Sequence, residues 1–374
     1  MISPTICQTS QTSQTQSSES QLRVLHLAGS PVSDFYYNLS LIYAKEVVQP
    51  VGVSSYYAVL HPDGFWQLGS SLESLSEKIS LQEMISRLPK MDVVVPHMFC
   101  FPGMTSFRAL FEDILGLPVV GSPSHSTALA TNKAQTKSVV AQEGVRVAKA
   151  QVIRPGEAVT MKPPFIVKAN SEDNSLGMSL VWHEDEIATA LQVGFEHDET
   201  LLVEDYIPGR ELRVAVVERG GQLSVLPAIE YLVTEENPIR TLHDKYELQS
   251  DGLPSKQPDK PAVKPVCPAK VTPSLWEKIS DAVKRAHIAL GCRECSLYDF
   301  RVHADTDEPY MLEASLYGSF SKIGMISRML QADGQSLSDL AWELWNAAAL
   351  RRTRVANGAK FKYVNLRKSD FHPR

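Results

Sequence analysis

The stretch "SLYDFRVHADTDEPYMLEAS", residues 296–315, contains two apolar runs joined by a polar segment rich in turn-forming residues. This pattern predicts a β-hairpin whose loop is centred on Thr306. Antiparallel pairing around that centre places Asp299 opposite Glu313, because both residues are equally far from Thr306. Facing carboxylates repel each other by a few tenths to about 1 kcal/mol, so we expect a cation between them.

The oxygen atoms of this hairpin suit a magnesium ion. Ser315 follows Glu313 by two residues, and the alternation of side chains along a strand puts its hydroxyl on the same face. Such oxygen ligands fit Mg²⁺, which takes a few protein carboxylates together with substrate phosphates. A solvent-exposed hairpin whose carboxylates only raise solubility explains the same residues. The pairing alone leaves both interpretations open.

The composition is that of a globular protein without a basic surface. Of the 374 residues, 43% are hydrophobic and 21% are charged, and the net charge is -6. This length is enough for two or three compact domains. An acidic chain has no field that would hold a nucleic-acid backbone, and no apolar run reaches the ~18 residues of a membrane span. Neither nucleic acid nor a membrane is therefore an expected partner.

The amino terminus and the cysteines predict a cytoplasmic location. Residues 1–20 are rich in Gln, Ser and Thr and lack the apolar core of a signal peptide, which predicts a disordered tail. The odd number of cysteines fits a reducing compartment. Cys292 and Cys295 form a CxxC motif, but no second pair of ligands lies at zinc-site spacing. We interpret them as thiols at the start of a strand.

Two α/β segments are predicted in the first half of the chain. Residues 21–122 alternate strand-like and helical patterns, which predicts an open α/β sheet. Residues 123–207 predict a small α+β domain. The expected strands are 22–29, 91–99, 117–122, 163–170, 175–182 and 200–207, and the main expected helices are 34–48 and 126–144.

The second half of the chain predicts an antiparallel sheet domain at residues 208–350. Apolar runs on both sides of Gly220 and Gly221 are a strong hairpin signal. The proline-rich segment 252–273 predicts an exposed connection. Helices are expected at 274–291 and 336–350, and a basic tail follows at 351–374.

The order and spacing of these segments over residues 22–350 resemble the ATP-grasp ligases of the D-alanine:D-alanine ligase type. The resemblance lies in "GSPSHSTALATNKAQTK", "PPFIVKANSEDNSLGMSLV", "LLVEDYIPGRELRVAV" and "HDKYEL", which precede the hairpin in this order. It implies an ATP-grasp fold, with an N-terminal open α/β domain, a small central domain and a C-terminal antiparallel-sheet domain. It also implies ATP and one or two Mg²⁺ ions as cofactors.

The resemblance implies roles for individual residues around the phosphates. Lys133 and Lys168 match the phosphate-binding lysines, and Asn174, Ser175 and Gly177 match the loop that covers the nucleotide. Because ATP carries about four negative charges, lysines and Mg²⁺ are needed to hold its terminal phosphoryl group for transfer. Taken alone, a residue such as Lys133 also fits an ordinary lysine on a helix surface.

The hinge and the transfer site are implied in the same way. Glu204, Asp205 and Ile207 match the adenine hinge, and Glu211 matches the residue that holds the ribose hydroxyls. The predicted catalytic residues are Lys245, Arg301 and Ser175, and the predicted metal ligands are Asp299, Glu313 and Ser315.

Three positions depart from the D-alanine ligase pattern. That family has a His-Gly pair where this chain has Phe99 and Cys100, an arginine where it has Leu297, and an asparagine where it has Ser315. The arginine would donate to the charge on a tetrahedral adduct, an interaction typically worth ~3 kcal/mol. Its loss places carboxylate chemistry on D-alanine in doubt.

Other stretches resemble the mycosporine-glycine:amino acid ligases. They are "LHLAGSPVSDFYYNLSLIYAKE", "VVPHMFCFPGMTSFRALFE", "LYDFRV" and "LEASLYGSF". This resemblance implies ATP-dependent condensation of mycosporine-glycine with a serine-like or threonine-like amino acid, which gives a disubstituted mycosporine-like amino acid, the class of natural UV sunscreens. It leaves open which amino acid is preferred.

Several alternatives remain at this point. Two other functions fit the sequence. The protein could be a dipeptide ligase that joins two amino acids, or a nucleotide-binding relative without turnover. Related ligases are commonly dimers, which makes a homodimer one possible state, and the sequence leaves the oligomeric state open. Substrate contacts are expected from Ser30, His97, Arg108, Arg301 and Tyr317, with a core or surface role equally open for each.

Overall fold

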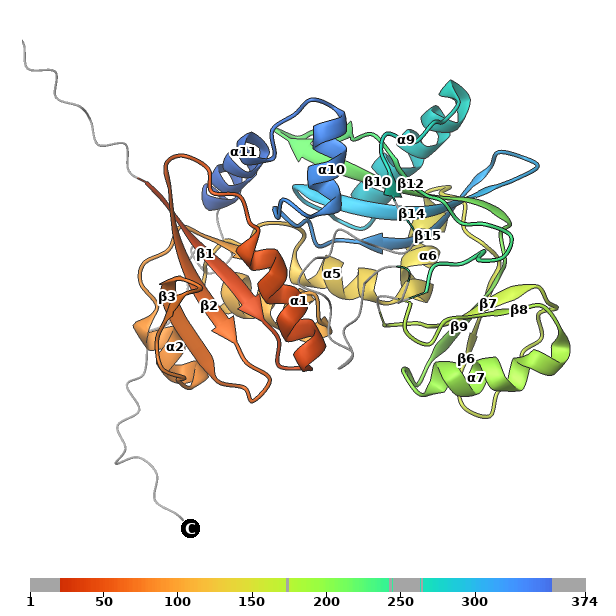
Figure 1. The fold of residues 1–374 in the computed structure, drawn as a ribbon, viewed down its shortest axis with the longest axis horizontal. Helices are drawn as coiled ribbons and strands as arrows, with labels where there is room; N and C mark the ends of the chain where they lie inside the picture. Colours follow the sequence, from red (N-terminus) through yellow and green to blue (C-terminus); the bar gives the residue numbers. More distant parts are fainter. Residues whose placement is uncertain (1–20, 173–174, 242–243, 245–262, 264, 352–374) are drawn as a thin grey trace, which may run out of the picture.

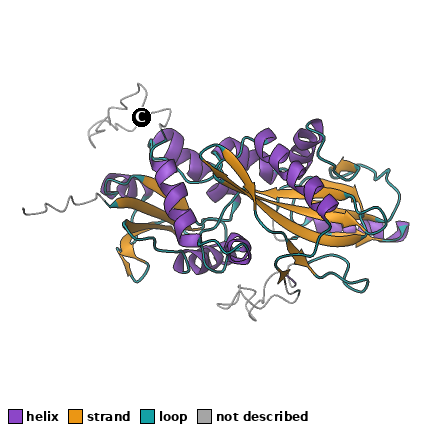
Figure 2. Ribbon diagram, turned by 90° about the horizontal axis from the view of Figure 1, so that it is seen from above, coloured by secondary structure: helices purple, strands orange, loops and turns teal. Residues whose placement is uncertain are grey.

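A computed structural model of the chain describes residues 21–351 except 173–174, 242–243, 245–262 and 264 (Figure 1). These residues form three sheets, which we name by position. The N-terminal sheet lies at one end of the long axis and the small central sheet at the other, with the C-terminal sheet above the latter. Seen from above, helices lie alongside the strands in both halves of the molecule (Figure 2).

The N-terminal sheet has five strands in the order β4-β3-β2-β1-β5. They are β1 (Leu22–Gly29), β2 (Val53–Leu60), β3 (Trp66–Ser71), β4 (Ser74–Leu75) and β5 (Val93–Pro96). β1 pairs in parallel with β2 and β5, and α1 (Asp34–Lys45) packs against β1. The first predicted strand and the α/β class are confirmed. β2, β3 and β4 were missed by the sequence analysis, as was the short helix α2 (Leu81–Arg87).

Two histidines are buried between β1 and β5. His26 Nδ1 lies 3.0 Å from His97 Nε2, and the His26 Nε2 atom lies 3.1 Å from the hydroxyl of Ser55. Burial lowers the pKa of His97 to about 3. Burial, together with the neighbouring His97, holds the pKa of His26 well below its usual value of 6.5. Both rings are therefore neutral in the folded protein near pH 7.

Lowering the pH from about 7.5 to about 5.5 should reduce the free energy of unfolding by about 3 kcal/mol. The unfolded chain takes up protons on both histidines as the pH falls through about 6.5, while the folded rings stay neutral, so stability present above that pH is lost below it. Urea unfolding at the two pH values measures the change. His97→Gln should remove about half of it; an unchanged pH dependence in this variant would contradict the burial of two neutral rings.

Short helices connect the N-terminal sheet to the rest of the molecule. They are α3 (Phe101–Met104), α4 (Ser106–Ala109), the π-helical turn η1 (Leu110–Ile114), α5 (Ser124–Thr131) and α6 (Lys133–Gln142). The single helix predicted at 126–144 is wrong in its continuity, because Asn132 breaks it and caps α6 by accepting from the N–H of Gln135. The strand predicted at 117–122 is also wrong. Only Val119 makes a bridge, to Val94.

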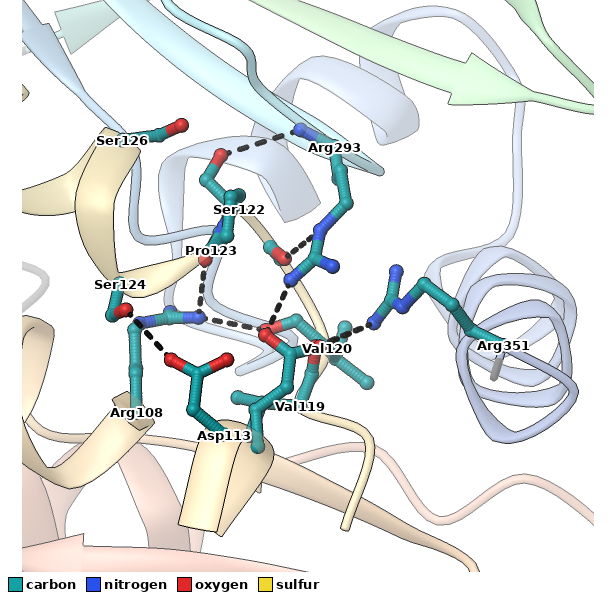
Figure 3. A network of polar contacts seen from close by, with 12 residues as sticks. Arg108, Asp113, Val119, Val120, Ser122, Pro123, Ser124, Ser126, Arg293 and Arg351 are labelled. Atoms are coloured by element: carbon teal, nitrogen blue, oxygen red, sulfur yellow. Dashed lines mark hydrogen bonds and ion pairs between the residues drawn. The ribbon is translucent and has the colours of Figure 1, made fainter. Parts of the chain in front are cut away.

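Three arginines from distant parts of the chain hold the segment 119–123 (Figure 3). Arg108 on α4 donates to two of its carbonyl groups at 3.0 and 3.1 Å, and Arg293 and Arg351 each donate to another. Burial lowers the pKa of Arg108 to about 10. Arg108 therefore ties this segment to α4 within the N-terminal part, a structural use that differs from the expected substrate contact. Arg293 and Arg351 join the same segment to the C-terminal part.

The central sheet has the order β6-β9-β7-β8 and is covered by one helix. Its elements are β6 (Ala150–Ile153), β7 (Phe165–Ala169), β8 (Ser179–Val181), η2 (Glu184–Glu186), α7 (Ile187–Phe195) and β9 (Leu201–Asp205). All of its strands are antiparallel. The predicted strands 163–170 and 200–207 are confirmed in place, each somewhat shorter than expected. The strand predicted at 175–182 is present only as the three residues Ser179–Val181.

The C-terminal sheet is built on the long antiparallel strands β10 (Gly209–Arg219), β14 (Cys295–His303) and β15 (Pro309–Ser315). β11 (Gln222–Val225) closes the hairpin predicted at Gly220 and Gly221. β12 (Ile229–Tyr231) pairs with the same edge of β10 as β11, opposite β14, and β13 (Pro265–Val266) pairs with β12. Gly209 has φ +133°, and a Cβ atom there would lie 2.1 Å from the Val302 carbonyl oxygen. Only glycine allows β10 to start this close to β14.

Three helices complete the C-terminal part. They are α9 (Pro273–Ala289), α10 (Met325–Ala332) and α11 (Leu337–Ala349). α9 and α11 confirm the predicted helices, while α10 was missed. In the described part of the chain, no helix is long and apolar enough to cross a membrane. The predicted tails and most of 252–273 lie outside the described residues, and the domain boundaries stay predictions.

Candidate nucleotide and transfer site

A cleft of about 790 Å³, open to solvent, is lined by strands of the central and C-terminal sheets. β7 and β9 line one side, and β10, β14 and β15 line the other. Its lining residues include Lys133, Lys168, Ser175, Glu204, Asp205, Ile207, Glu211, Asp299, Arg301 and Glu313. The cleft therefore brings together, from segments far apart in sequence, most of the residues that the sequence assigned to nucleotide binding.

A buried charge cluster lies where β7 and β9 meet α6. The Glu204 carboxylate pairs with Lys168 through one oxygen and with Lys137 through the other, the latter at 2.9 Å. Burial lowers the pKa of Lys137 to about 8, against the opposing effect of Glu204. Burial would raise the pKa of Glu204, but the two lysines outweigh it and lower that pKa. The cluster places two cations on one carboxylate.

The start of α6 positions Lys133 at the edge of the cleft. Its backbone N–H donates to the carbonyl of Asn170 at 3.0 Å, and the side-chain oxygen of Asn170 accepts from the next N–H of the helix at 2.9 Å. The Lys133 ammonium donates to the backbone carbonyl of Glu172. Lys137 follows four residues later, so both lysines project from the same side of the helix.

Glu211 on β10 is held by two arginines. Arg240 pairs with one of its oxygens at 2.6 Å and lies 3.4 Å from the centre of the Tyr231 ring. Arg301 lies 3.7 Å from the other oxygen. Arg301 also donates to the backbone carbonyl of Ile207 at 3.0 Å, which ties β14 to the hinge after β9. Its assignment as a catalytic residue stays a prediction.

The described residues of the loop after β7 contact the segment that carries Arg240. Ser175 has φ 62° and Gly177 has φ 65°, a left-handed conformation that turns the loop back on itself. The Ser175 hydroxyl donates to the backbone carbonyl of Arg240 at 2.8 Å. Asn174 and Lys245 lie outside the described residues, so their predicted roles stay untested.

The hairpin of β14 and β15 has the expected pairing at the predicted metal residues. Asp299 and Glu313 are directly opposed, and a register shift follows immediately at Phe300. Both line the cleft. Burial raises the pKa of Asp299, and Glu313 adds to this rise, while Arg213 opposes it. A cationic residue, Arg213 on β10, is directly opposed to Asp299 on the side away from Glu313. The cation expected between the two carboxylates stays a prediction.

Arg213 holds both oxygens of Asp299. Its Nε atom donates to Oδ1 at 2.6 Å and its Nη2 atom to Oδ2 at 2.5 Å, a two-bond geometry with good charge complementarity. Among the described residues, no group of three or more His, Cys, Asp or Glu side chains is placed to hold a metal ion. The donors still fit Mg²⁺, which needs only one or two carboxylates when substrate phosphates supply the rest.

A second cavity, of about 430 Å³, adjoins the first at Glu313. The two share Lys133, Glu172 and Glu313 as lining residues. The remaining lining residues come from α3, α5, the loop after β7 and the segment after Glu313; they are Met104, Thr127, Ala130, Thr131, Ser171, Ala314, Ser315, Leu316 and Tyr317. A group placed there would lie on the far side of Glu313 from most of the nucleotide cleft.

Sequence reasoning missed three charged residues of this region. Two of them could have been found from the sequence. Lys137 follows Lys133 by four residues, which returns to the same face of a helix, and Arg213 follows Glu211 by two, which returns to the same face of a strand.

Arg240 lies on an irregular segment, so no periodicity in the sequence pointed to it. His97, which was considered for substrate contact, is instead buried against His26.

Comparisons with known proteins identify the family of this chain. The family model described as "D-ala D-ala ligase C-terminus" matches residues 134–346. A D-alanine--D-alanine ligase from Halalkalibacterium halodurans is 27% identical over 61% of this chain and 72% of its own length. D-alanine--D-alanine ligase B from Mesorhizobium japonicum is 30% identical over 64% of this chain and 75% of its own length.

Solved structures show the same fold. The VanG D-Ala:D-Ser ligase from Enterococcus faecalis superposes with a TM-score of 0.72 at 20% identity, over 88% of this chain and 99% of that one. A D-alanine--D-alanine ligase from Bacillus anthracis, solved with ATP, gives 0.66 at 17% identity, over 88% and 97%. The family model covers more than half of the sequence. The chain therefore belongs to the D-Ala-D-Ala ligase family, with the ATP-grasp fold of an ATP-dependent carbon–nitrogen ligase.

Proposed function

We propose that this ligase condenses mycosporine-glycine with a serine-like or threonine-like amino acid, at the expense of ATP. The stretches that resemble the mycosporine-glycine:amino acid ligases support this substrate. The observation that carries the proposal is the row of residues next to the Asp299–Glu313 pair in the sheet. In this row Leu297 faces Ala215 on one side and Ser315 on the other, so the row carries no charge.

An uncharged row suits an electrophile other than a carboxylate. A carboxylate substrate passes through a tetrahedral adduct whose oxyanion needs a preorganised donor, and Leu297 supplies none. Mycosporine-glycine offers a vinylogous amide carbonyl instead. The glycine nitrogen, which is attached to the ring and conjugated with this carbonyl, shares the charge of the reacting centre, so an arginine at this position is not required.

The proposed reaction balances in two steps. The carbonyl oxygen attacks the terminal phosphorus of ATP, the bond to the bridging oxygen breaks, and ADP leaves. The amine of the amino acid then forms a bond to the activated ring carbon. Phosphate departs with the electron pair of the carbon–oxygen bond. The nitrogen gives up its two protons, one to the departing phosphate and one to solvent or a nearby base, and a conjugated imine remains.

The residues that line the two cavities divide between the two substrates of this reaction, ATP and the phosphate acceptor. We assign Lys133 and Lys168 to the phosphates, where they offset charge and hold the terminal phosphoryl group in line. Asp299 and Glu313 would hold a Mg²⁺ ion, which supplies charge neutralisation at the phosphates when bound. The cavity beside Tyr317 adjoins the transfer point and is the proposed acceptor pocket.

Dipeptide ligation is the second candidate, and one observation favours it directly. The relatives found by sequence carry the name D-alanine--D-alanine ligase, and one structural neighbour is a D-Ala:D-Ser ligase. In that case a carboxylate would be the phosphate acceptor. The three departures at Phe99, Leu297 and Ser315 count against it.

Phosphate release separates the candidates. The purified protein is incubated with ATP, Mg²⁺ and different acceptor pairs, and inorganic phosphate is measured together with the ultraviolet spectrum. We expect release with mycosporine-glycine plus serine or threonine, accompanied by a red shift of the absorption. Release with D-alanine alone, and none with mycosporine-glycine, would establish the second candidate and reject the first.

A further inference from the structure

Three aromatic rings in a row lead from the N-terminal sheet to the second cavity. Tyr43 on α1 lies edge to face with Phe99, which follows β5, with 4.8 Å between the ring centres and 66° between the planes. Phe99 in turn lies edge to face with Tyr317, at 5.5 Å and 76°. Both distances are in the range, about 4.5–7 Å, at which aromatic pairs attract each other. Neither Tyr43 nor Phe99 is among the described residues that line the two cavities, so an effect of Phe99 on a bound molecule passes through Tyr317.

Tyr317 borders the protein core on one side and the second cavity on the other. It packs against the buried apolar cluster of the N-terminal part, and it also lines the second cavity. Phe99 belongs to that cluster and is 7% exposed. Because interiors are close-packed, Phe99 cannot move away from Tyr317 without opening a void. The Tyr317 ring is therefore held in place at the wall of the cavity.

The lining of the second cavity divides into a charged end and an uncharged remainder. Its three charged residues, Lys133, Glu172 and Glu313, are the three that also line the nucleotide cleft. Among the described residues that line the cavity, Tyr317 carries the only aromatic ring. A molecule whose reacting group lies at the charged end, next to the phosphates, has the rest of its body beside that ring. A flat conjugated ring system is the shape that stacks on it.

We propose that Tyr317 is the surface on which the conjugated ring of the acceptor stacks, and that Phe99 is the positioning residue that holds Tyr317 there. This inference rests on the proposed function, because it takes mycosporine-glycine as the acceptor. It gives a physical role to Phe99, one of the three departures from the D-alanine ligase pattern. It also names a source of specificity, since D-alanine has no ring to stack.

The first test measures binding without turnover. Mycosporine-glycine is titrated into the full chain with Mg²⁺ and a non-hydrolysable ATP analogue present, and isothermal titration calorimetry gives its Kd. Tyr317→Leu should raise this Kd about tenfold, equivalent to about 1.4 kcal/mol, because aromatic stacking contributes on this order. Tyr317→Phe keeps the ring, so its Kd should stay within about twofold of the parent value. Equal losses in the two variants, or no loss in either, would overturn the proposal.

A double-mutant cycle tests whether Phe99 acts through Tyr317. Phe99→Leu alone should raise the Kd of mycosporine-glycine about fourfold, because Tyr317 loses the ring that supports it. In a chain that already carries Tyr317→Leu, the same change should add less than about twofold, since the two effects share one contact. The Kd of the ATP analogue should change less than about twofold in every variant. No effect of Phe99→Leu, or effects that add, would overturn the positioning role of Phe99.

Phe107 provides a matched control in the same apolar cluster. It lies edge to face with Trp66 at 5.5 Å and 75°, nearly the geometry of the Phe99–Tyr317 pair, but it is not among the described residues that line either cavity. Phe107→Leu should leave the Kd of mycosporine-glycine within about twofold. A loss as large as that in Phe99→Leu would trace both to general loosening of the core and overturn the proposal. A parent protein that binds D-alanine but no mycosporine-glycine would reject the proposed function, and this inference with it, before any variant is compared.

Discussion

Glu313→Gln should abolish turnover, with phosphate release reduced by at least about 10²-fold, while the fold stays intact. Glutamine has the same shape as glutamate but lacks the charge that would hold a divalent ion beside Asp299. Glu313 is also one of the three residues that line both cavities, with Lys133 and Glu172. Loss of the Glu313 charge should therefore affect the phosphoryl transfer from the nucleotide in the first cavity to the acceptor in the second. Phosphate release measures the effect, and far-ultraviolet circular dichroism checks the fold.

Glu308→Gln is the control for this variant. Glu308 lies at the end of the same hairpin loop and pairs with Lys278 and, at 3.5 Å, with Arg146 at the surface. The same chemical change there should alter turnover by less than about twofold, because exposed ion pairs contribute little. Normal turnover in Glu313→Gln would refute the metal assignment.

Glu204→Gln should lower the free energy of unfolding by about 3–5 kcal/mol. This glutamate is the shared partner of Lys137 and Lys168, and the side chains of Glu204 and Lys137 are almost fully buried, at 3% and 5% exposed. Without its charge, two buried ammonium groups face each other with only a neutral amide between them. Urea unfolding monitored by circular dichroism measures the loss.

A partly exposed ion pair calibrates this result. Glu230 on β12 pairs with Arg210 on β10, where the arginine side chain is 36% exposed. Glu230→Gln should cost no more than about 1 kcal/mol. If Glu204→Gln were as mild as this control, the cluster would not be the buried unit that the structure describes. Added ATP should restore part of the lost stability if the freed lysines bind its phosphates.

The hairpin was predictable because its signal is local. Alternation and a turn-rich centre at Thr306 fixed both strands, and the predicted pairing of Asp299 with Glu313 is confirmed. This agreement depends on a β-bulge that the sequence did not reveal. From Phe300 toward the loop, the pairing is one residue out of register with a hairpin centred on Thr306. The bulge between Asp299 and Phe300 removes this offset, so that Asp299 faces Glu313. Loop conformation and bulges depend on tertiary packing, which local patterns do not encode.

The partners of the site residues were much less predictable. Which lysine or arginine meets a given carboxylate depends on how strands far apart in sequence are ordered. β10 lies between β12 and β14 in the sheet, and this order alone puts Arg213 beside Asp299. The break at Asn132 is a similar case, since helical periodicity continues through it.

The most direct measurement is anomalous diffraction from crystals grown with Mn²⁺ and a non-hydrolysable ATP analogue. We expect an ion bound by carboxylate oxygens of Asp299 and Glu313, at about 2.1–2.2 Å, and by phosphate oxygens of the nucleotide, with the Lys133 and Lys168 ammonium groups near the same phosphates. An ion bound elsewhere, or a nucleotide whose phosphates point away from the hairpin, would contradict the proposed site.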